Sequence, residues 1–289
     1  MGADSNLCVL HADVVTPSDV DLPPHSLPLT FFDVKWLRGP PVQRLFHYRL
    51  QDHHHHGNVQ QLLSDLRASL SKALNLFYPL AGHVRLAPDT NRYELFYQPG
   101  DGVSFTVAEY DADVGDLASD GPVQEQGQAK TTHFLFSVDH RARLKPPLPA
   151  TYFGNCSIPA IAVARHDELT VAGTGGLFTA FTAIANALEE VVGEGYQERW
   201  DGCGKRVMEA AKAGMMFVVG SPRFHVYDVD FGFGRPAKVV AVSGAMPGAM
   251  PVADARNGDG GVEVGLTFSA GGMEHFQRCF SDAMHAIGM

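Results

Sequence analysis

The chain has 289 residues, of which 45% are hydrophobic and 19% are charged, and its formal net charge at pH 7 is −10. This length allows one large or two modest domains with an apolar core. The basic residues are scattered through an acidic chain, which excludes a clustered nucleic-acid-binding footprint. The sequence shows no secretory signal and no apolar run of about eighteen residues, so we expect no membrane span. Its four cysteines form no C-x-x-C pair, as is typical of a cytoplasmic protein with reduced thiols.

The first 110 residues alternate between strand-like and helical patterns. A helix is expected over Val59–Phe77, where apolar residues recur with a period of 3.6, and Tyr78–Gly82 should end it because Pro79 cannot continue a helix. Runs rich in β-branched and aromatic residues predict strands at Leu7–Val15, Val42–Leu50, Tyr93–Tyr97 and Val103–Tyr110.

An acidic segment nearly devoid of large apolar residues, Asp111–Lys130, is typical of a linker. Beyond it, helices are expected at Leu177–Val192, Lys205–Lys212 and from Met273 onward, with strands at Thr131–Val138, Met215–Val219, Lys238–Ser243 and Val262–Phe268. Strands and helices do not strictly alternate, which favours a mixed α/β fold over a doubly wound parallel sheet. The predicted organisation is a first domain over 1–120, a linker over 121–130 and a second domain over 131–289.

The stretch Phe224–Val240 contains Asp-Phe-Gly and also fits G-x-G-x-x-A. A protein kinase would also require the motif H-R-D-x-x-x-x-N, which the chain lacks. A dinucleotide-binding site would require a helix directly after the glycines, but Pro236 and a β-like run occupy that position. We expect a strand from His225 to Phe231, a Gly-x-Gly turn and a returning strand. Asp228 and Asp230 would then share one face. An aspartate at the end of such a strand would be partly buried and would need an arginine or backbone donors to stay ionised, and a structural ion pair is favoured over a catalytic carboxylate.

Two other patterns invite catalytic or metal chemistry. The adjacent histidines His53–His56 are more typical of a solvated loop than of convergent metal ligands, so no metal is predicted. Cys156 has no histidine partner that the sequence reveals and is expected to be a small buried hydrophobe. A serine-hydrolase G-x-S-x-G motif is absent from the sequence.

Four segments occur in an order that resembles the plant BAHD acyltransferases, specifically the branch that acylates, often malonylates, flavonoid and phenolic glucosides. They are Leu27–Tyr48, Leu66–Val84, Phe136–Cys156 and Gly220–Val239. The resemblance implies a chloramphenicol-acetyltransferase-like mixed-sheet architecture. It also implies an acyl-CoA cosubstrate, with malonyl-CoA as one candidate, a phenolic or flavonoid acceptor, no tightly bound cofactor and a monomeric chain without nucleic-acid or membrane partners.

The resemblance assigns two groups of motif residues. The first is this chain's form of the family's Asp-Phe-Gly-Trp-Gly signature, with Phe233 in place of the usual tryptophan: Asp230, Phe231, Gly232, Phe233 and Gly234. In the family this loop supports structure and the coenzyme A channel, and its aspartate pairs with an arginine, here Arg141 or else Arg143. Loss of a buried Asp230 would cost about 3–5 kcal/mol. The second group is Tyr152, Phe153, Gly154 and Asn155.

The family's catalytic motif, His-x-x-x-Asp, has no match, because no histidine is followed four residues later by aspartate. The near misses have the wrong spacing: His133 with Asp139, His166 with Asp167, and His225 with Asp228. No catalytic residue is therefore assigned. The family's base would fall where residues 121–130 now lie, so the chain has the pattern of two acyltransferase ends joined across an internal deletion. Two hypotheses follow: an acyltransferase, or an inactive remnant that binds ligand or partner.

Overall fold

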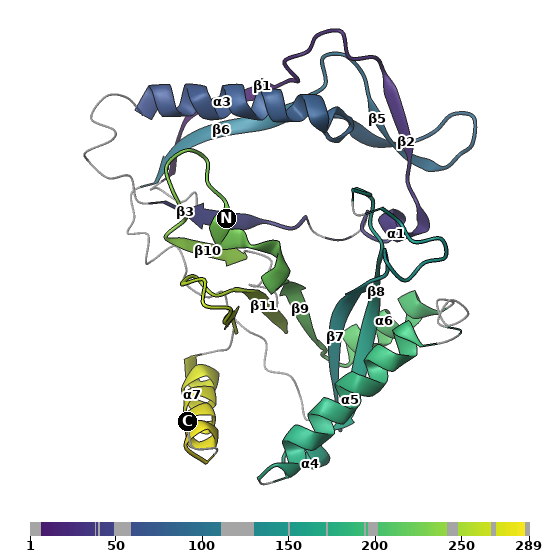
Figure 1. Cartoon of the computed structure of the whole chain (residues 1–289), viewed down its shortest axis with the longest axis vertical. Helices are drawn as coiled ribbons and strands as arrows, with labels where there is room; N and C mark the ends of the chain where they lie inside the picture. The colour runs from purple at the N-terminus through teal and green to yellow at the C-terminus, as the bar shows by residue number, and fades with distance from the viewer. Residues whose placement is uncertain are drawn as a thin grey trace. The chain divides into compact units, whose positions relative to one another are not determined.

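The computed structural model describes residues 7–37, 39, 41–48, 59–110, 130–149, 151–171, 173–193, 195, 202–241, 248–266 and 270–286 (Figure 1). Contacts divide the chain into two units. Unit 1 comprises Met1–Pro40, Tyr48–Ser119 and Asp230–Gly234, and unit 2 comprises Pro41–His47, Asp120–Val229 and Arg235–Met289. The Asp-Phe-Gly-Phe-Gly segment thus groups with the N-terminal part of the chain. The predicted linker lies outside the described residues except for Lys130, and the predicted domain boundaries stay a prediction.

Unit 1 contains two small antiparallel sheets. β1 (Leu7–Val15) pairs with β6 (Val103–Tyr110), and a register shift lies between Val9 and His11. The other sheet has the order β2-β5-β4, formed by His25–Pro28, Tyr93–Tyr97 and His83–Leu86. Helix α1 (Phe31–Val34) follows β2 and begins with a capping box between Thr30 and Asp33.

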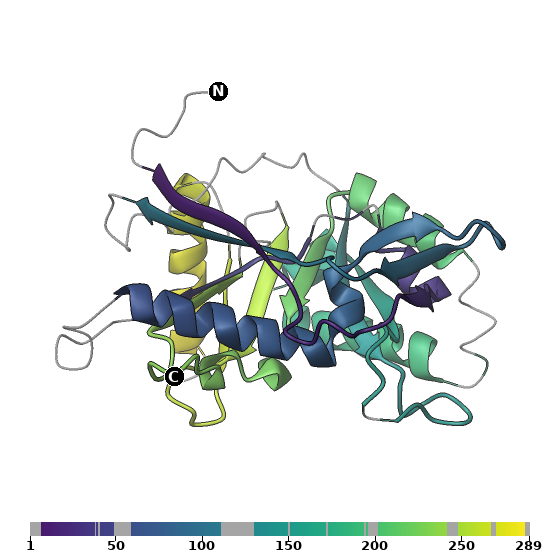
Figure 2. The same ribbon diagram turned by 90° about the horizontal axis from the view of Figure 1, so that it is seen from above.

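The long helix of unit 1, α3 (Val59–Leu76), lies along β1 (Figures 1 and 2). Its Leu74 packs with Val15 and Tyr97 in the buried core of this unit. The helix is followed by a 3₁₀ turn, η1 (Tyr78–Ala81), and then by Gly82. A Cβ at Gly82 would overlap with the backbone of Phe96 in β5, so glycine is required for this close approach.

Unit 2 is built on a mixed five-stranded sheet with the order β12-β11-β9-β7-β8. Its strands are β7 (Thr131–Asp139), β8 (Ser157–Arg165), β9 (Met216–Gly220), β11 (Ala249–Asp254) and β12 (Val262–Val264). β9 runs parallel to both β7 and β11, whereas the two outer pairings are antiparallel. A separate antiparallel pair joins β10 (Lys238–Ala241) to β3 (Arg44–His47).

Helices of unit 2 cover part of this sheet. Helix α5 (Gly175–Val192) packs against β8 (Figure 1), whose inward residues Ile158, Ala160 and Ala162 are buried. Around it lie α4 (His166–Leu169) and α6 (Cys203–Lys212), while α7 (Ala270–Ala286) ends the described chain. The predicted helices and most of the predicted strands are confirmed within a few residues.

The sequence patterns missed β2, β4, β8 and β11. Three of these strands contain a proline (Pro28, Pro159 or Pro251), a residue that ordinarily lowers the expectation of a strand. The five-stranded sheet with both parallel and antiparallel pairings confirms the predicted mixed α/β class.

Candidate functional site

The Asp-Phe-Gly-Phe-Gly segment forms a tight loop organised by Asp230. One carboxylate oxygen, Oδ1, accepts hydrogen bonds from the backbone N–H groups of Gly232 at 2.7 Å and of Gly234 at 2.9 Å. Both glycines have positive φ, 101° and 89°, a region that favours glycine over other residues. The aspartate is therefore the local organiser of the loop, and the two glycines supply the backbone conformation that it requires.

The two phenylalanines of this loop pack on Tyr48, a third aromatic residue within unit 1. Tyr48 meets Phe233 edge-on, with ring centroids 4.6 Å apart, and meets Phe231 at 5.9 Å. Such edge-to-face contacts stabilise aromatic pairs beyond the area they bury. Burial raises the pKa of the Tyr48 hydroxyl, and the negative charge of Asp230 adds to the rise. Phe233 thus makes an aromatic packing contact with Tyr48 inside unit 1.

The strand predicted over His225–Phe231 is wrong. His225 has a left-handed backbone with φ of 47°, and a 3₁₀ turn, η5, spans Val226–Asp228. Consecutive residues Val226 and Tyr227 are both buried, which an alternating strand with one buried face would not allow. Asp228 is exposed and pairs with Arg235 at 2.7 Å. Asp230 is exposed as well, so the partial burial expected for an aspartate at the end of this strand is also wrong.

Arg141 organises the second motif, Tyr152–Asn155. Its guanidinium donates from Nη2 to the carbonyl oxygen of Gly154 at 2.8 Å and from Nε to the carbonyl oxygen of Tyr152 at 3.4 Å. A third group, Nη1, reaches the carboxylate of Asp139 at 3.1 Å. Arg141 therefore joins the end of β7 to the motif. The predicted pair of Arg141 with Asp230 would join the two units and stays a prediction.

Cys156 follows this motif directly and is 1% exposed. Its carbonyl oxygen accepts the backbone N–H of His140, which is itself fully buried. Burial lowers the pKa of the His140 imidazole, with a further contribution from the positive charge of Arg143. The position of Cys156 matches the expected buried hydrophobe. His140, which the sequence reasoning had not singled out, is held neutral inside unit 2.

The three near-miss histidine–aspartate pairs do not form imidazole–carboxylate contacts within the described part of the chain. Two other pairs do approach each other in unit 1: His83 Nδ1 lies 3.7 Å from Asp101 Oδ2, and His11 Nε2 lies 3.9 Å from Asp13 Oδ2. Sequence spacing could not indicate the first pair, because β4 and the turn before β6 bring its members together. Both histidines are exposed and could meet a ligand.

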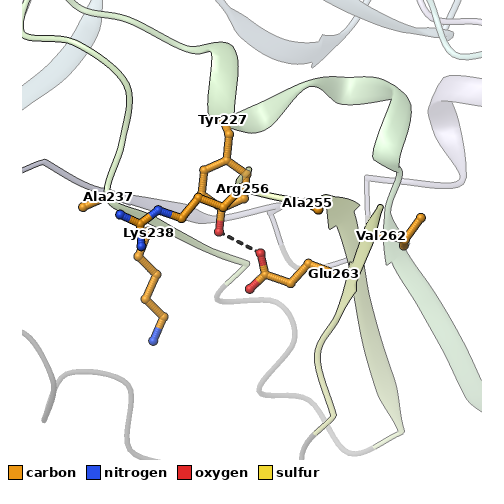
Figure 3. A pocket seen from close by; sticks show the side chains of 7 residues that line it. All are labelled: Tyr227, Ala237, Lys238, Ala255, Arg256, Val262 and Glu263. Carbon is orange, nitrogen blue, oxygen red and sulfur yellow. Dashed lines mark hydrogen bonds between the residues drawn. The ribbon is translucent and has the colours of Figure 1, made fainter. Parts of the chain in front are cut away.

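A pocket of about 480 Å³ lies in unit 2, close in sequence to the Asp-Phe-Gly-Phe-Gly loop. At its centre the buried Tyr227 donates its hydroxyl to Glu263 Oε2 at 2.8 Å (Figure 3). Burial raises the pKa of this hydroxyl, and the hydrogen bond to Glu263 raises it further. The remaining walls are Ala237, Lys238, Ala255, Arg256 and Val262.

Within the described ranges, no group of three or more His, Cys, Asp or Glu side chains could hold a metal ion, and His53–His56 lies outside those ranges. In the same ranges, no helix has the length and apolar composition that crossing a membrane requires.

Comparison with known proteins defines the class. The sequence profile of the Transferase family matches residues 6–127 and 122–283. The fold resembles the crystal structure of vinorine synthase, with a TM-score of 0.64, 15% sequence identity, and coverage of 93% of this chain and 96% of that chain. The likeness confirms the predicted architecture. The chain therefore belongs to the Transferase family, the BAHD acyltransferases.

Individual relatives show which branch of the family the chain resembles. The chain is 31% identical to "Malonyl-coenzyme A:anthocyanin 3-O-glucoside-6''-O-malonyltransferase" of Dahlia pinnata, over 56% of this chain and 35% of the relative. It is 36% identical to "Phenolic glucoside malonyltransferase 1" of Arabidopsis thaliana, over 52% of this chain and 31% of the relative. The match thus spans about a third of each relative's length. These matches confirm the resemblance to the flavonoid and phenolic glucoside branch.

Proposed function

We propose that this chain is an acyl-CoA-dependent acyltransferase that acts on a hydroxyl of a phenolic or flavonoid glycoside. The observation that carries the proposal is the ordered series of family motifs, which the family profile matches over residues 6–127 and 122–283. Two of the relatives are named as malonyltransferases of glucosides, which supports malonyl-CoA as a donor to test first. In this proposal the acyl-CoA is a cosubstrate, and no tightly bound cofactor is required.

The junction of the two matched segments supports an internal deletion. They meet at residues 122–127, inside the predicted linker 121–130. We place there the loss of the end of the first domain and the beginning of the second. This is the interval in which the family's His-x-x-x-Asp motif is expected.

A second candidate function is ligand binding without turnover. The observation that favours it is the sequence itself, which contains 14 histidines but no His-x-x-x-Asp. A hydroxyl is a poor nucleophile at neutral pH, so loss of the general base costs about 10²–10⁴-fold in rate. His140 could not replace that base, because a fully buried imidazole does not reach a substrate.

An acyl-transfer assay separates the two candidates. The full chain is incubated with malonyl-, acetyl- and hydroxycinnamoyl-CoA against flavonoid and phenolic glucosides, and acylated products are measured by mass spectrometry. The variants His83→Ala and His11→Ala test the two imidazoles that approach carboxylates, and heat-treated protein provides the background.

Acylated product above background, reduced about 10²-fold or more by one histidine substitution, supports catalysis by the chain. Product formation that is insensitive to every histidine substitution contradicts a histidine base. No product with any donor, together with measurable binding of acyl-CoA, supports the second candidate.

A further inference from the structure

We propose that the pocket around Tyr227 in unit 2 binds the phosphate group of an organic phosphate. Two positively charged side chains line this pocket: Lys238 at the start of β10 and Arg256 in the turn between β11 and β12. Neither forms an ion pair with any residue in the described part of the chain, whereas Arg235, which lies close to Lys238 in the sequence, pairs with Asp228. Unpaired cations at a concave site, in a chain with a formal net charge of −10, indicate an anionic ligand.

The acidic residue of the pocket does not cancel this charge. Glu263 accepts the hydroxyl of Tyr227 at 2.8 Å, which directs one of its oxygens to a buried donor. With Lys238 and Arg256 opposing this one carboxylate, the pocket keeps a net positive charge. Arg256 also acts on Tyr227, because its positive charge opposes the rise in the pKa of that hydroxyl. The guanidinium therefore lies within electrostatic reach of the centre of the pocket.

Backbone hydrogen bonds fix the segments that carry Tyr227 and Arg256. The backbone N–H of Val226 donates to Asp254 Oδ1 at 3.0 Å, which holds the 3₁₀ turn η5 against the end of β11. The turn beyond β11 is closed by the Ala255 N–H, which donates to the Gly261 carbonyl oxygen at 3.0 Å. Since Tyr227 and Arg256 each neighbour one of these bonded residues, their backbone positions are defined by hydrogen bonds.

The size and chemistry of the pocket indicate the ligand class. Its volume of about 480 Å³ exceeds what a bare inorganic ion needs and falls in the range of small-molecule sites. Arginine and lysine together are well suited to phosphate oxygens, because both remain charged and Arg can donate two parallel hydrogen bonds. The apolar walls Ala237, Ala255 and Val262 offer contact to the organic part of such a ligand (Figure 3). The phosphate could come from the coenzyme A of an acyl donor or from another phosphorylated metabolite.

Binding is tested by isothermal titration of the full chain with adenosine 3′,5′-bisphosphate, coenzyme A and pantetheine, which lacks phosphate. The test variant is Lys238→Ala/Arg256→Ala, and the matched control is Lys212→Ala/Arg278→Ala, which removes the same net charge from exposed helix positions. Circular dichroism establishes that both variants keep the fold. We expect the test variant to bind the bisphosphate about tenfold or more weakly, since each charge-assisted hydrogen bond is substantial. Binding should also weaken as salt is raised from low concentration.

Equal weakening of coenzyme A binding, with no binding of pantetheine, would identify the phosphates of coenzyme A as the source. Weakened bisphosphate binding with coenzyme A unaffected would identify another phosphorylated ligand, and both results support the pocket. The proposal is overturned if wild-type chain binds no phosphorylated probe, if the test variant binds as the wild type does, or if the control loses as much affinity. Because no acyl group is transferred, the result is independent of whether the chain catalyses acyl transfer.

Discussion

The guanidinium of Arg141 and the carbonyl oxygen of Gly154 are joined by a hydrogen bond of 2.8 Å. The bond links the end of β7 to the family motif Tyr152–Asn155, thirteen residues farther along the chain. Side-chain bonds of this kind satisfy the backbone carbonyls of a segment that has no ladder partner. The role of Arg141 visible in unit 2 is therefore to hold a loop.

Replacing Arg141 with alanine should lower the free energy of unfolding by about 1–3 kcal/mol, because two backbone carbonyls and Asp139 lose a charged donor. Urea denaturation measures the change. Arg165→Ala is the matched control, since it removes a largely exposed ion pair with Asp167 and should lower the stability less than Arg141→Ala does. Equal effects of the two substitutions would contradict a loop-holding role for Arg141.

Asp230→Ala should destabilise the chain by about 1 kcal/mol, the range of a lost side-chain cap, because two glycine N–H groups lose their acceptor. This value replaces the larger cost expected for a buried charge, since Asp230 is exposed. Asp230→Asn keeps an acceptor oxygen and should retain most of the stability. Thermal unfolding of both variants provides the measurement. A loss of about 3–5 kcal/mol for Asp230→Ala would instead support the predicted pairing with an arginine across the units.

Stability should fall as the pH is lowered below about 6.5, the ordinary pKa of histidine. Burial, followed by the charge of Arg143, lowers the pKa of His140 in the folded chain. Between the folded and unfolded pKa values the unfolded chain binds the extra proton, so acid favours unfolding by up to about 1.4 kcal/mol per pH unit. This contribution is fully present above the unfolded pKa and is lost as the pH falls through that window.

Urea denaturation at pH 8, 7, 6 and 5 tests the His140 contribution, with His140→Leu as the comparison. The variant should show a flatter pH dependence whatever its absolute stability. Asp139 does not interfere. Burial acts to raise the pKa of this carboxyl, but the hydrogen bonds and positive charge of Arg141, together with the charge of Arg143, hold it below the usual value, so its contribution is lost only in stronger acid. The same slope in both proteins would show that another group is responsible.

One face of α5 is apolar and exposed: Leu177, Phe178 and Phe181 are each about 70% exposed. An internal deletion would uncover apolar faces that the complete fold covers, and exposed apolar patches favour aggregation. Phe178→Glu/Phe181→Lys places an opposite-charge pair three residues apart on this helix and should raise the soluble yield. Ala187→Glu on the buried face of the same helix is the control and should lower it. Soluble fraction after expression is the measurement, and an unchanged yield for the double variant would remove this face as a cause of aggregation.

Periodic segments were predictable because their local patterns agree with their tertiary surroundings. The stripe of leucines that predicted Val59–Phe77 is the face that α3 uses, since Leu70 and Leu74 reach the core of unit 1. The segment around Val226 was not predictable, because it depends on distant partners. The N–H of Val226 bonds to Asp254, and the hydroxyl of Tyr227 bonds to Glu263, 36 residues away. Those contacts override the strand propensity of the segment.

The sequence alone determined the family, the mixed α/β class and the absence of His-x-x-x-Asp. This was possible because motifs and periodic patterns consist of residues that are contiguous in the chain. Only the tertiary structure decided that Asp230 organises its own loop, that Arg141 holds Gly154, and that Lys238 and Arg256 stand at one pocket. The reason is physical: hydrogen bonds and charges act across a few ångströms of space, and chain folding brings those groups together from positions that sequence spacing does not relate.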